Sequence, residues 1–137
     1  MKKIAYLLMF ALLLGGCSSI TVKSELVDAN NENLSKLSVG MSEAQVDKIM
    51  KKETYRFGGV RVAPMGVYYD AAVTIKNPYK SETLQSKEET SLDVKYYFTS
   101  NKGKAKEIDD NNLTPVVFEK GKLIGWGWDF LKGKTQK

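Results

Sequence analysis

Few residues of this sequence could carry chemistry, and the most distinctive of them is a single cysteine. Cys17 is the only cysteine among 137 residues, and the chain contains no histidine. A lone thiol cannot form an internal disulfide, and zinc sites built from cysteine and histidine need several such ligands. Without histidine, the chain also lacks the commonest general base near neutral pH. Chemistry on the thiol, or chemistry by carboxylates and lysines, is what remains.

Carboxylates that could act together occur at few places. Asp109 and Asp110 are adjacent, Glu88 and Glu89 are adjacent, and Asp70 lies in a stretch of β-forming residues. A catalytic pair needs carboxylates that converge in a cleft, where one pKa is raised. Both adjacent pairs fall in polar segments that we expect to be solvated loops. We therefore expect that the chain is not an enzyme and that it binds no metal and no cofactor.

The first 16 residues have the pattern of a secretory signal peptide. Lys2 and Lys3 precede an uninterrupted apolar run over residues 4–14 (IAYLLMFALLL). At a rise of about 1.5 Å per residue this run covers roughly 17 Å, whereas the hydrocarbon core of a bilayer is about 30 Å thick. The run is too short to span a membrane, so a leader cleaved after residue 16 is the stronger interpretation.

The end of this leader, residues 14–17 (LGGC), resembles the lipobox of bacterial lipoproteins. That resemblance implies cleavage before Cys17, a diacylglyceryl thioether on its sulfur and an acyl chain on its nitrogen. Two acyl signals give stable membrane anchoring where one chain does not. In Gram-negative lipoproteins, serines such as Ser18 and Ser19 after the cysteine are typical of the outer membrane, on its periplasmic face; in a Gram-positive host this rule does not apply. The alternative is a simple secretory signal with an incidental cysteine.

The net charge indicates only a mild preference for anionic surfaces. The formal charge is +5, and removal of Lys2 and Lys3 leaves 19 basic and 16 acidic residues, or +3. This excess suits an anionic lipid surface, but an ordinary solvated surface explains it as well. Arg56 and Arg61 are the only arginines, and no basic stripe interleaved with aromatic residues occurs. We therefore expect no nucleic-acid partner.

Beyond Cys17 we divide the chain into three parts. Residues 17–32 are polar and show no sustained period, which predicts a lipidated, flexible tether with a reach of about 20 Å. Residues 33–131 carry the patterns of one folded domain, for which a chain of this length has room. Residues 132–137 (KGKTQK) are predicted to be a disordered basic tail.

The clearest local signal is the start of a helix. Ser42 and Gln45 have the spacing of a capping box, in which each side chain bonds the backbone of the other residue. Apolar residues follow at helical spacing: Val46, Ile49 and Met50. These features predict a helix over residues 43–52, and residues 33–37 (NLSKL) predict a shorter one before it.

Three later segments are rich in β-forming residues, namely 55–62, 67–75 and 92–99. The last alternates, and its apolar face consists of Leu92, Val94, Tyr96 and Phe98. Tyr97 lies on the opposite face, so we expect it at the surface. The polar segments between the strands are predicted loops or strand edges: residues 80–91 and 101–112.

A hairpin is predicted near the C-terminus, with strands over residues 115–119 and 122–128. Simple alternation puts one set of side chains on one face: Ile124, Trp126 and Trp128. The opposite face then holds Leu123, Gly125 and Gly127. Glycines on one face of a strand cost stability unless a neighbour needs the space. Either a helix packs closely over them or a partner approaches, and packing is the expectation.

The segment over residues 37–46 (LSVGMSEAQV) resembles the small outer-membrane lipoproteins of the SmpA/OmlA (BamE-like) group. The resemblance implies an α+β fold (ααβββ), with two N-terminal helices packed on a small antiparallel sheet of three or four strands. Members of the group are accessory subunits of the machinery that inserts β-barrels into the outer membrane. The second half of the chain, including residues 77–79 and 114–128, resembles uncharacterised envelope lipoproteins instead, from which no activity follows.

These observations favour a membrane-anchored envelope lipoprotein with a non-catalytic interaction or assembly role, in outer-membrane protein assembly or envelope maintenance. Its expected partners are the membrane, through the N-terminal lipid, and another envelope protein. Aromatic residues are enriched at binding hot spots, which makes five residues candidate contacts: Tyr68, Tyr69, Tyr97, Trp126 and Trp128. Burial in the core is the competing role for each. The alternative function is periplasmic binding of a lipid, glycan or peptide over the glycine face at residues 125–127.

Overall fold

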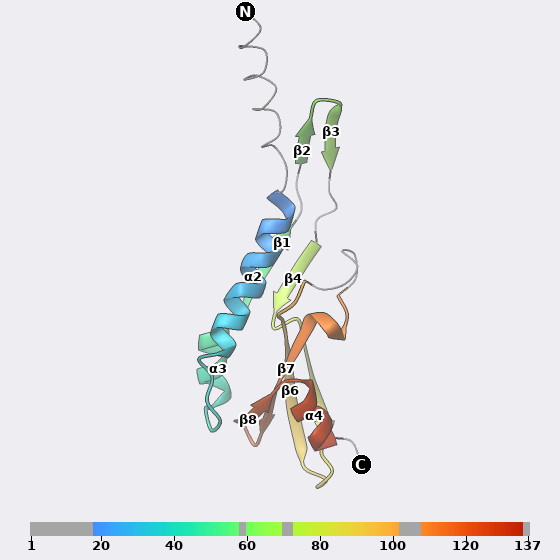
Figure 1. The fold of residues 1–137 in the computed structure, drawn as a ribbon. Coiled ribbons are helices and arrows are strands. Elements are labelled where there is room, and N and C mark those ends of the chain that lie inside the picture. The colour runs from blue at the N-terminus through green and yellow to red at the C-terminus, as the bar shows by residue number, and fades with distance from the viewer. Residues whose placement is uncertain (1–17, 58–59, 70–72, 102–107, 136–137) are drawn as a thin grey trace, which may run out of the picture.

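The computed structural model describes residues 18–57, 60–69, 73–101 and 108–135. It is an α+β fold with two helices first, then antiparallel sheets of two and four strands, and a helix at the C-terminal end (Figure 1). The predicted fold class is confirmed at this level. Within the described ranges, no helix combines the length and the apolar character needed to cross a membrane.

The first helix, α2 (Ser18–Leu34), corrects the prediction of a flexible tether over residues 17–32. Leu26 is 2% exposed and Asn30 is 1% exposed, so this helix packs against the body of the protein. The Asn30 side chain also donates a hydrogen bond to the carbonyl oxygen of Phe98 over 2.8 Å. The tether prediction is wrong because tertiary packing, rather than a strong apolar stripe, holds this polar segment in a helix.

The second helix, α3 (Glu43–Met50), begins as predicted. The backbone N–H of Gln45 donates to the Ser42 hydroxyl over 3.3 Å, and that of Ser42 donates to the Gln45 side chain over 2.9 Å. The capping box is therefore confirmed. Lys51 has a φ of 56°, which ends the helix before the predicted boundary at residue 52.

The main sheet has four antiparallel strands in chain order. They are β5 (Lys80–Gln85), β6 (Ser91–Phe98), β7 (Leu113–Glu119) and β8 (Lys122–Trp126). A short 3₁₀ helix, η2 (Asp110–Asn112), precedes β7. The predicted strand near residues 92–99 and the C-terminal hairpin are both confirmed, and part of the predicted polar segment 80–91 forms the edge strand β5.

Both faces of the inner strands β6 and β7 are covered, which the alternation in β6 did not reveal. One core contains the predicted apolar face of β6 and residues of α2, β4, β7 and the C-terminal helix: Leu26, Ile75, Leu92, Val94, Tyr96, Phe98, Leu113, Val117 and Leu131. The other core contains residues from the end of α2, from α3 and from the opposite face of the sheet: Leu34, Leu37, Val46, Met50, Tyr97, Val116, Phe118 and Leu123. The predicted surface position of Tyr97 is wrong, since it is 1% exposed in this second core.

A buried pair of asparagines joins the helices to the strands. The Nδ2 atom of Asn77 donates to the carbonyl oxygens of Met50 (2.7 Å) and Lys51 (3.0 Å). Asn30 and Asn77 also bond each other through their side-chain amides, over 3.0 and 3.2 Å. Because buried polar groups need such partners, this cluster fixes how α2, the end of α3 and β4 meet.

The C-terminal helix, α4 (Trp128–Thr135), corrects the prediction of a disordered tail over residues 132–137. Leu131 is buried, and the carbonyl oxygen of Lys134 accepts a hydrogen bond of 2.9 Å from the backbone N–H of Lys87. Residues 136–137 lie outside the described part. The correction has a physical cause, because burial of the apolar residues at its start holds the polar end of this helix in place.

A β-bulge in β8 corrects the predicted faces of the C-terminal hairpin. Val117 pairs with Gly125 and Phe118 pairs with Leu123, which leaves Ile124 as an extra residue. The alternation is therefore interrupted, and Leu123 and Gly125 belong to opposite faces.

The remaining strands form two short antiparallel pairs along the segment between α3 and the main sheet. Strand β1 (Glu53–Phe57) pairs with β4 (Val73–Asn77). Strand β2 (Val60–Ala63) pairs with β3 (Gly66–Tyr69), and Ala63 and Gly66 form the pair next to the turn. The predicted strands over residues 55–62 and 67–75 thus each correspond to two shorter strands.

Candidate functional site

The feature of the structure that most clearly faces outward is the hairpin of β2 and β3, which we call the projecting hairpin (residues 60–69). Pro64 and Met65 lie between its paired ends. The Met65 side chain is 91% exposed and that of Val67 is 53% exposed. Single exposed apolar residues are common on proteins, whereas contiguous apolar patches mark interaction sites, so two such residues on one turn make it a candidate contact surface.

The projecting hairpin and the start of α2 lie at the same end of the molecule. Figure 1 shows β2 and β3 extending beyond β1 and β4, toward the end at which α2 begins. The first residue of α2 is Ser18, which follows the predicted lipidation site, Cys17, directly in the sequence. Cys17 itself lies outside the described residues. A helix of 17 residues is about 25 Å long, so α2 separates this end from the loop before α3.

The five aromatic residues predicted as partner contacts are not brought together. Tyr97 is buried, so it offers no surface to a partner. Trp128 is half-buried against the Tyr96 ring, with ring centroids 5.6 Å apart, and its indole N–H donates to the carbonyl oxygen of Leu113 over 2.7 Å. Trp126 is 37% exposed at the end of β8. The backbones of Tyr68 and Tyr69 belong to the projecting hairpin, but their side chains lie outside what is described.

Sequence reasoning missed Met65 and Val67. The signal was present, because a proline-containing turn interrupts two runs of β-forming residues there. Between residues 57 and 69 the only charged residue is Arg61. Charged residues are mostly exposed in folded proteins, so a surface segment with a single charge was the available signal for this tip.

Tyr97 has an unusual environment inside the second core. Its hydroxyl is buried without a hydrogen-bond partner among the described residues. Burial, followed by the negative charges of Asp47 and Glu43, raises the pKa of Tyr97 above its usual range. The hydroxyl is therefore held protonated, and the sealed position under α3 gives it no access to a substrate.

The carboxylates near Tyr97 are paired with a lysine. The Lys95 amine lies 2.6 Å from Oδ1 of Asp47 and 2.8 Å from Oε1 of Glu43. Burial lowers the pKa of Lys95, but its hydrogen bonds to the two carboxylates outweigh burial and raise the pKa overall. This cluster joins β6 to α3, so its evident role is structural.

The acidic residues considered as catalytic candidates do not form a site among the described residues. Asp109 accepts a hydrogen bond from the Asn111 backbone and caps η2, while Asp110 lies 3.7 Å from the Lys80 amine. Glu88 and Glu89 are exposed in the turn between β5 and β6. Asp70 lies outside the described part.

The glycine face does not provide the pocket that the ligand-binding alternative required. A Cβ atom on Gly125 would lie 2.6 Å from the Phe130 ring of α4, so a helix side chain occupies that space. The expectation that packing explains Gly125 is confirmed. Gly127 instead has a φ of 94°, which favours glycine for its backbone conformation.

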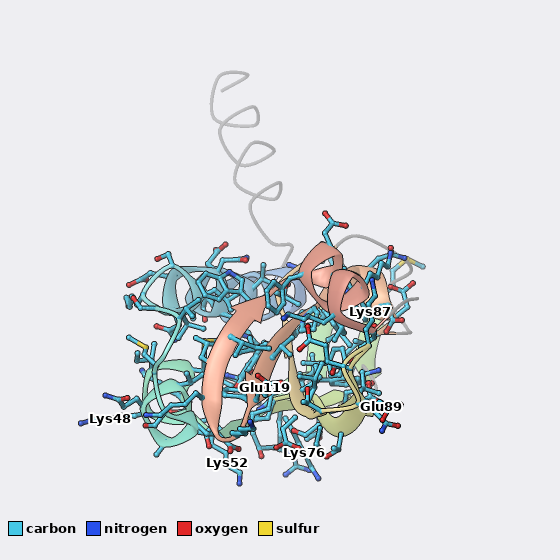
Figure 2. The ribbon with its side chains drawn as sticks, turned by 90° about the horizontal axis from the view of Figure 1, so that it is seen from below. Lys48, Lys52, Lys76, Lys87, Glu89 and Glu119 are labelled. Carbon is cyan, nitrogen blue, oxygen red and sulfur yellow. The ribbon has the colours of Figure 1, made fainter. Side chains whose placement is uncertain are left out.

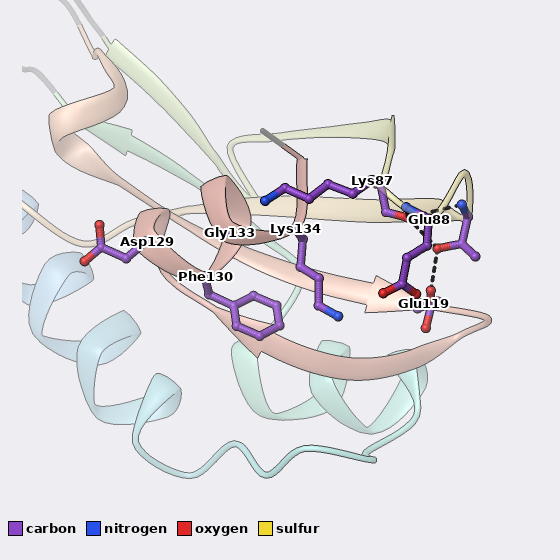
Figure 3. Close-up of a pocket in the computed structure, with 9 residues that line it drawn as sticks. Lys87, Glu88, Glu119, Asp129, Phe130, Gly133 and Lys134 are labelled. Atoms are coloured by element: carbon purple, nitrogen blue, oxygen red, sulfur yellow. Dashed lines mark hydrogen bonds between the residues drawn. The ribbon is translucent and has the colours of Figure 1, made fainter. Parts of the chain in front are cut away.

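A cavity of about 330 Å³, lined in part by Phe130, lies between α4 and the turn that follows β5 (Figure 3). Its hydroxyls bond within the fold: those of Ser86 and Thr90 bond each other over 2.7 Å, and Thr90 donates to Glu119 over 2.6 Å. Lysines and carboxylates are mixed around it. A lining that mixes both charges does not favour one class of ligand over another.

Lysines also line one side of the molecule. Figure 2 shows Lys48, Lys52 and Lys76 pointing outward from α3, from the segment after it and from β4. Lys52 and Lys76 border a hollow of about 300 Å³. Their amines diverge into solvent rather than converge on a point, as expected of a solvated basic surface.

Comparisons with known proteins assign no relative to this chain. No protein-family model matches it, no curated protein matches it, and no solved structure matches its fold.

Proposed function

We propose that this chain is a lipid-anchored, non-catalytic protein of the bacterial cell envelope that acts by contact, with the projecting hairpin as its contact element. The observation that carries the proposal is the exposure of Met65 and Val67 on a hairpin at the same end of the molecule as the start of α2. A two-stranded hairpin is only marginally stable alone in water, so a surface that covers its tip would stabilise it.

The sequence supports the anchor and its place. The leader over residues 1–16 and the lipobox at Cys17 favour export and lipidation, and Ser18 and Ser19 favour the periplasmic face of the outer membrane in a Gram-negative host. The helix that begins at Ser18 would then hold the folded body close to the lipid rather than on a slack tether.

An assembly or maintenance role is the finer form of this proposal. It draws support from residues 37–46, which resemble the SmpA/OmlA group, and from the packing of α3 on one face of the four-stranded sheet. Another envelope protein is the proposed partner in that role. Trp126, exposed at the end of β8, remains a candidate contact for it on the body of the protein.

The test is crosslinking in cells from a photoreactive residue placed at position 65 or at position 39. Val39 is the matched control, because it is 66% exposed but follows the opposite end of α2. Both positions are compared in the wild-type chain and in Cys17→Ser. We expect adducts from position 65 in the lipidated chain, few from position 39, and a large loss from position 65 in Cys17→Ser.

Two results would contradict the proposal. Equal adducts from positions 65 and 39 would show that the hairpin is not a special contact surface. Undiminished membrane retention and crosslinking in Cys17→Ser would show that lipid on this residue does not place the protein. Mass spectrometry of the purified wild-type chain gives the independent check, since lipidation adds a defined mass to the N-terminal peptide.

A further inference from the structure

The tip of the projecting hairpin has the chemistry of a segment that enters a membrane interface. Met65, the most exposed large apolar residue described, and Val67 stand on a turn that contains no acidic residue. Transfer of these side chains from water to an apolar environment lowers the free energy, roughly in proportion to the apolar area removed from water. A lipid surface can accept such a tip without the shaped pocket that a protein partner must provide.

The residues that follow the tip suit the polar boundary of a membrane. The register pairs Arg61 with Tyr68 and Val60 with Tyr69, on the side of the hairpin away from its tip. Tyrosine is enriched where a membrane meets water, and an arginine complements anionic headgroups. By residue type, the pairs behind the tip combine two tyrosines and one arginine with Val60 and Val62, a mixture compatible with the boundary between lipid and water.

The position of the hairpin gives it access to one particular membrane. The hairpin extends toward the end at which α2 begins, and Ser18 of that helix adjoins Cys17 (Figure 1). A lipid on Cys17 would place this end of the molecule at the bilayer surface. Because the anchor would already hold the chain at this membrane, the tip would meet lipid at a high effective concentration. Even a weak intrinsic affinity of the tip for lipid would then be enough for contact.

We propose that the tip of the projecting hairpin, at Met65 and Val67, enters the headgroup region of the same membrane that holds the Cys17 lipid. The inference rests on the proposed function, because it assumes the anchor. It adds that the surface contacted by the hairpin is lipid, and that the domain is held at two points with a fixed orientation. The side of the molecule distant from the tip would then face the periplasm and its proteins.

The test uses depth-dependent fluorescence quenching with the full, lipidated chain. Cys17 is the only native cysteine, so in Met65→Cys the thiol at position 65 is the one free site for an environment-sensitive dye once Cys17 carries lipid. Val39→Cys is the matched control. Each protein is reconstituted into vesicles of phosphatidylethanolamine and phosphatidylglycerol, with and without spin-labelled phosphatidylcholine.

We expect a blue shift and several-fold stronger quenching by spin-labelled lipid at position 65 than at position 39. Adding Val67→Asp to Met65→Cys should reduce the quenching toward that of the control, because a carboxylate is costly to bury in lipid. The fluorescence of Trp126 and Trp128, on the body of the protein, verifies that each variant is folded.

Equal, weak quenching at both positions overturns the membrane contact. Shielding at position 65 that requires added envelope protein, without quenching by lipid, also overturns it, but leaves the contact role of the hairpin intact. Failure of the anchor itself is visible separately, because a chain without lipid mass on Cys17 is detected before reconstitution.

Discussion

The four-stranded sheet and the projecting hairpin are both antiparallel, but they relate to solvent in opposite ways. In the sheet, β6 and β7 have both faces covered, by α3 on one side and by α2 and α4 on the other. In the hairpin, every residue whose side chain is described, residues 64–67, is exposed. Apolar residues of β6 and β7 stabilise the fold by their burial, whereas Met65 and Val67 at the hairpin tip contribute little to the core, which is why we propose a contact role for them.

The largest contrast is expected between Phe118→Ala and Met65→Ala. Phe118 is fully buried in the second core, and removal of a buried phenylalanine ring costs about 3–5 kcal/mol. Met65 touches mainly solvent, so its truncation should change the free energy of unfolding by less than about 0.5 kcal/mol. Urea denaturation followed by tryptophan fluorescence measures both. Similar losses in the two variants would show that the tip is part of the core and would remove the basis of the comparison.

A smaller but still substantial loss is expected for Asn77→Ala. This change removes the donor to the carbonyl oxygens of Met50 and Lys51 and to the side-chain oxygen of Asn30. Each buried group left without a hydrogen bond costs about 1–3 kcal/mol, so a total of roughly 2–4 kcal/mol is expected. The exposed Asn111→Ala is the control. If the two variants had equal stability in urea, the buried asparagines would not be what holds the helices to the strands.

The sequence predicted those elements whose signals are local. The start of α3 depends on Ser42 and Gln45, which lie three positions apart, and its capping box is formed as the spacing indicates. The turn of the C-terminal hairpin is likewise set by neighbouring residues, and it joins β7 to β8 as predicted. Such signals need no knowledge of the rest of the fold.

What the sequence could not predict depends on long-range packing. The buried positions of α2 include Leu26, Asn30 and Leu34, at spacings of four, but the polar member in the middle conceals the stripe. Asn30 can be buried in this stripe only because its side-chain amide donates hydrogen bonds to Asn77 and to the Phe98 carbonyl oxygen. A helix that depends on such contacts carries little local signal.

The candidate site was missed for a related reason. Alternation in β6 identified one buried face but could not show that α3 covers the other, so Tyr97 was assigned to the surface. The reverse holds at the tip of the hairpin, where Val67 fell within a predicted strand and Met65 lay in the interruption before it, with no role assigned to either residue. Whether a turn projects or folds back on the body is decided by the whole fold, and no local pattern records it.

The smallest change in stability is expected for Tyr97→Phe, which removes a polar atom from the core of the sheet. Because the Tyr97 hydroxyl is buried without a hydrogen bond among the described residues, its removal should raise the free energy of unfolding by about 1 kcal/mol at neutral pH. Tyr96→Phe is the matched control. It should lower stability instead, since the Tyr96 hydroxyl donates to Glu82 over 2.5 Å.

The pH dependence of Tyr97→Phe sharpens this prediction. Burial raises the pKa of Tyr97 in the folded state, so the unfolded state, with a phenol pKa of about 10, loses its proton first. Ionisation of this phenol therefore leaves the free energy of unfolding unchanged below about pH 10 and lowers it as the pH rises further. In Tyr97→Phe the decline above about pH 10 should be shallower, though still present because the pKa values of Tyr96 and Lys95 are also raised. Urea denaturation at neutral and alkaline pH measures the slope. If the slope in Tyr97→Phe equalled that of the wild-type chain, the Tyr97 hydroxyl would be in contact with water. Tyr97 would then resemble the exposed residues of the hairpin and not the buried residues of the sheet.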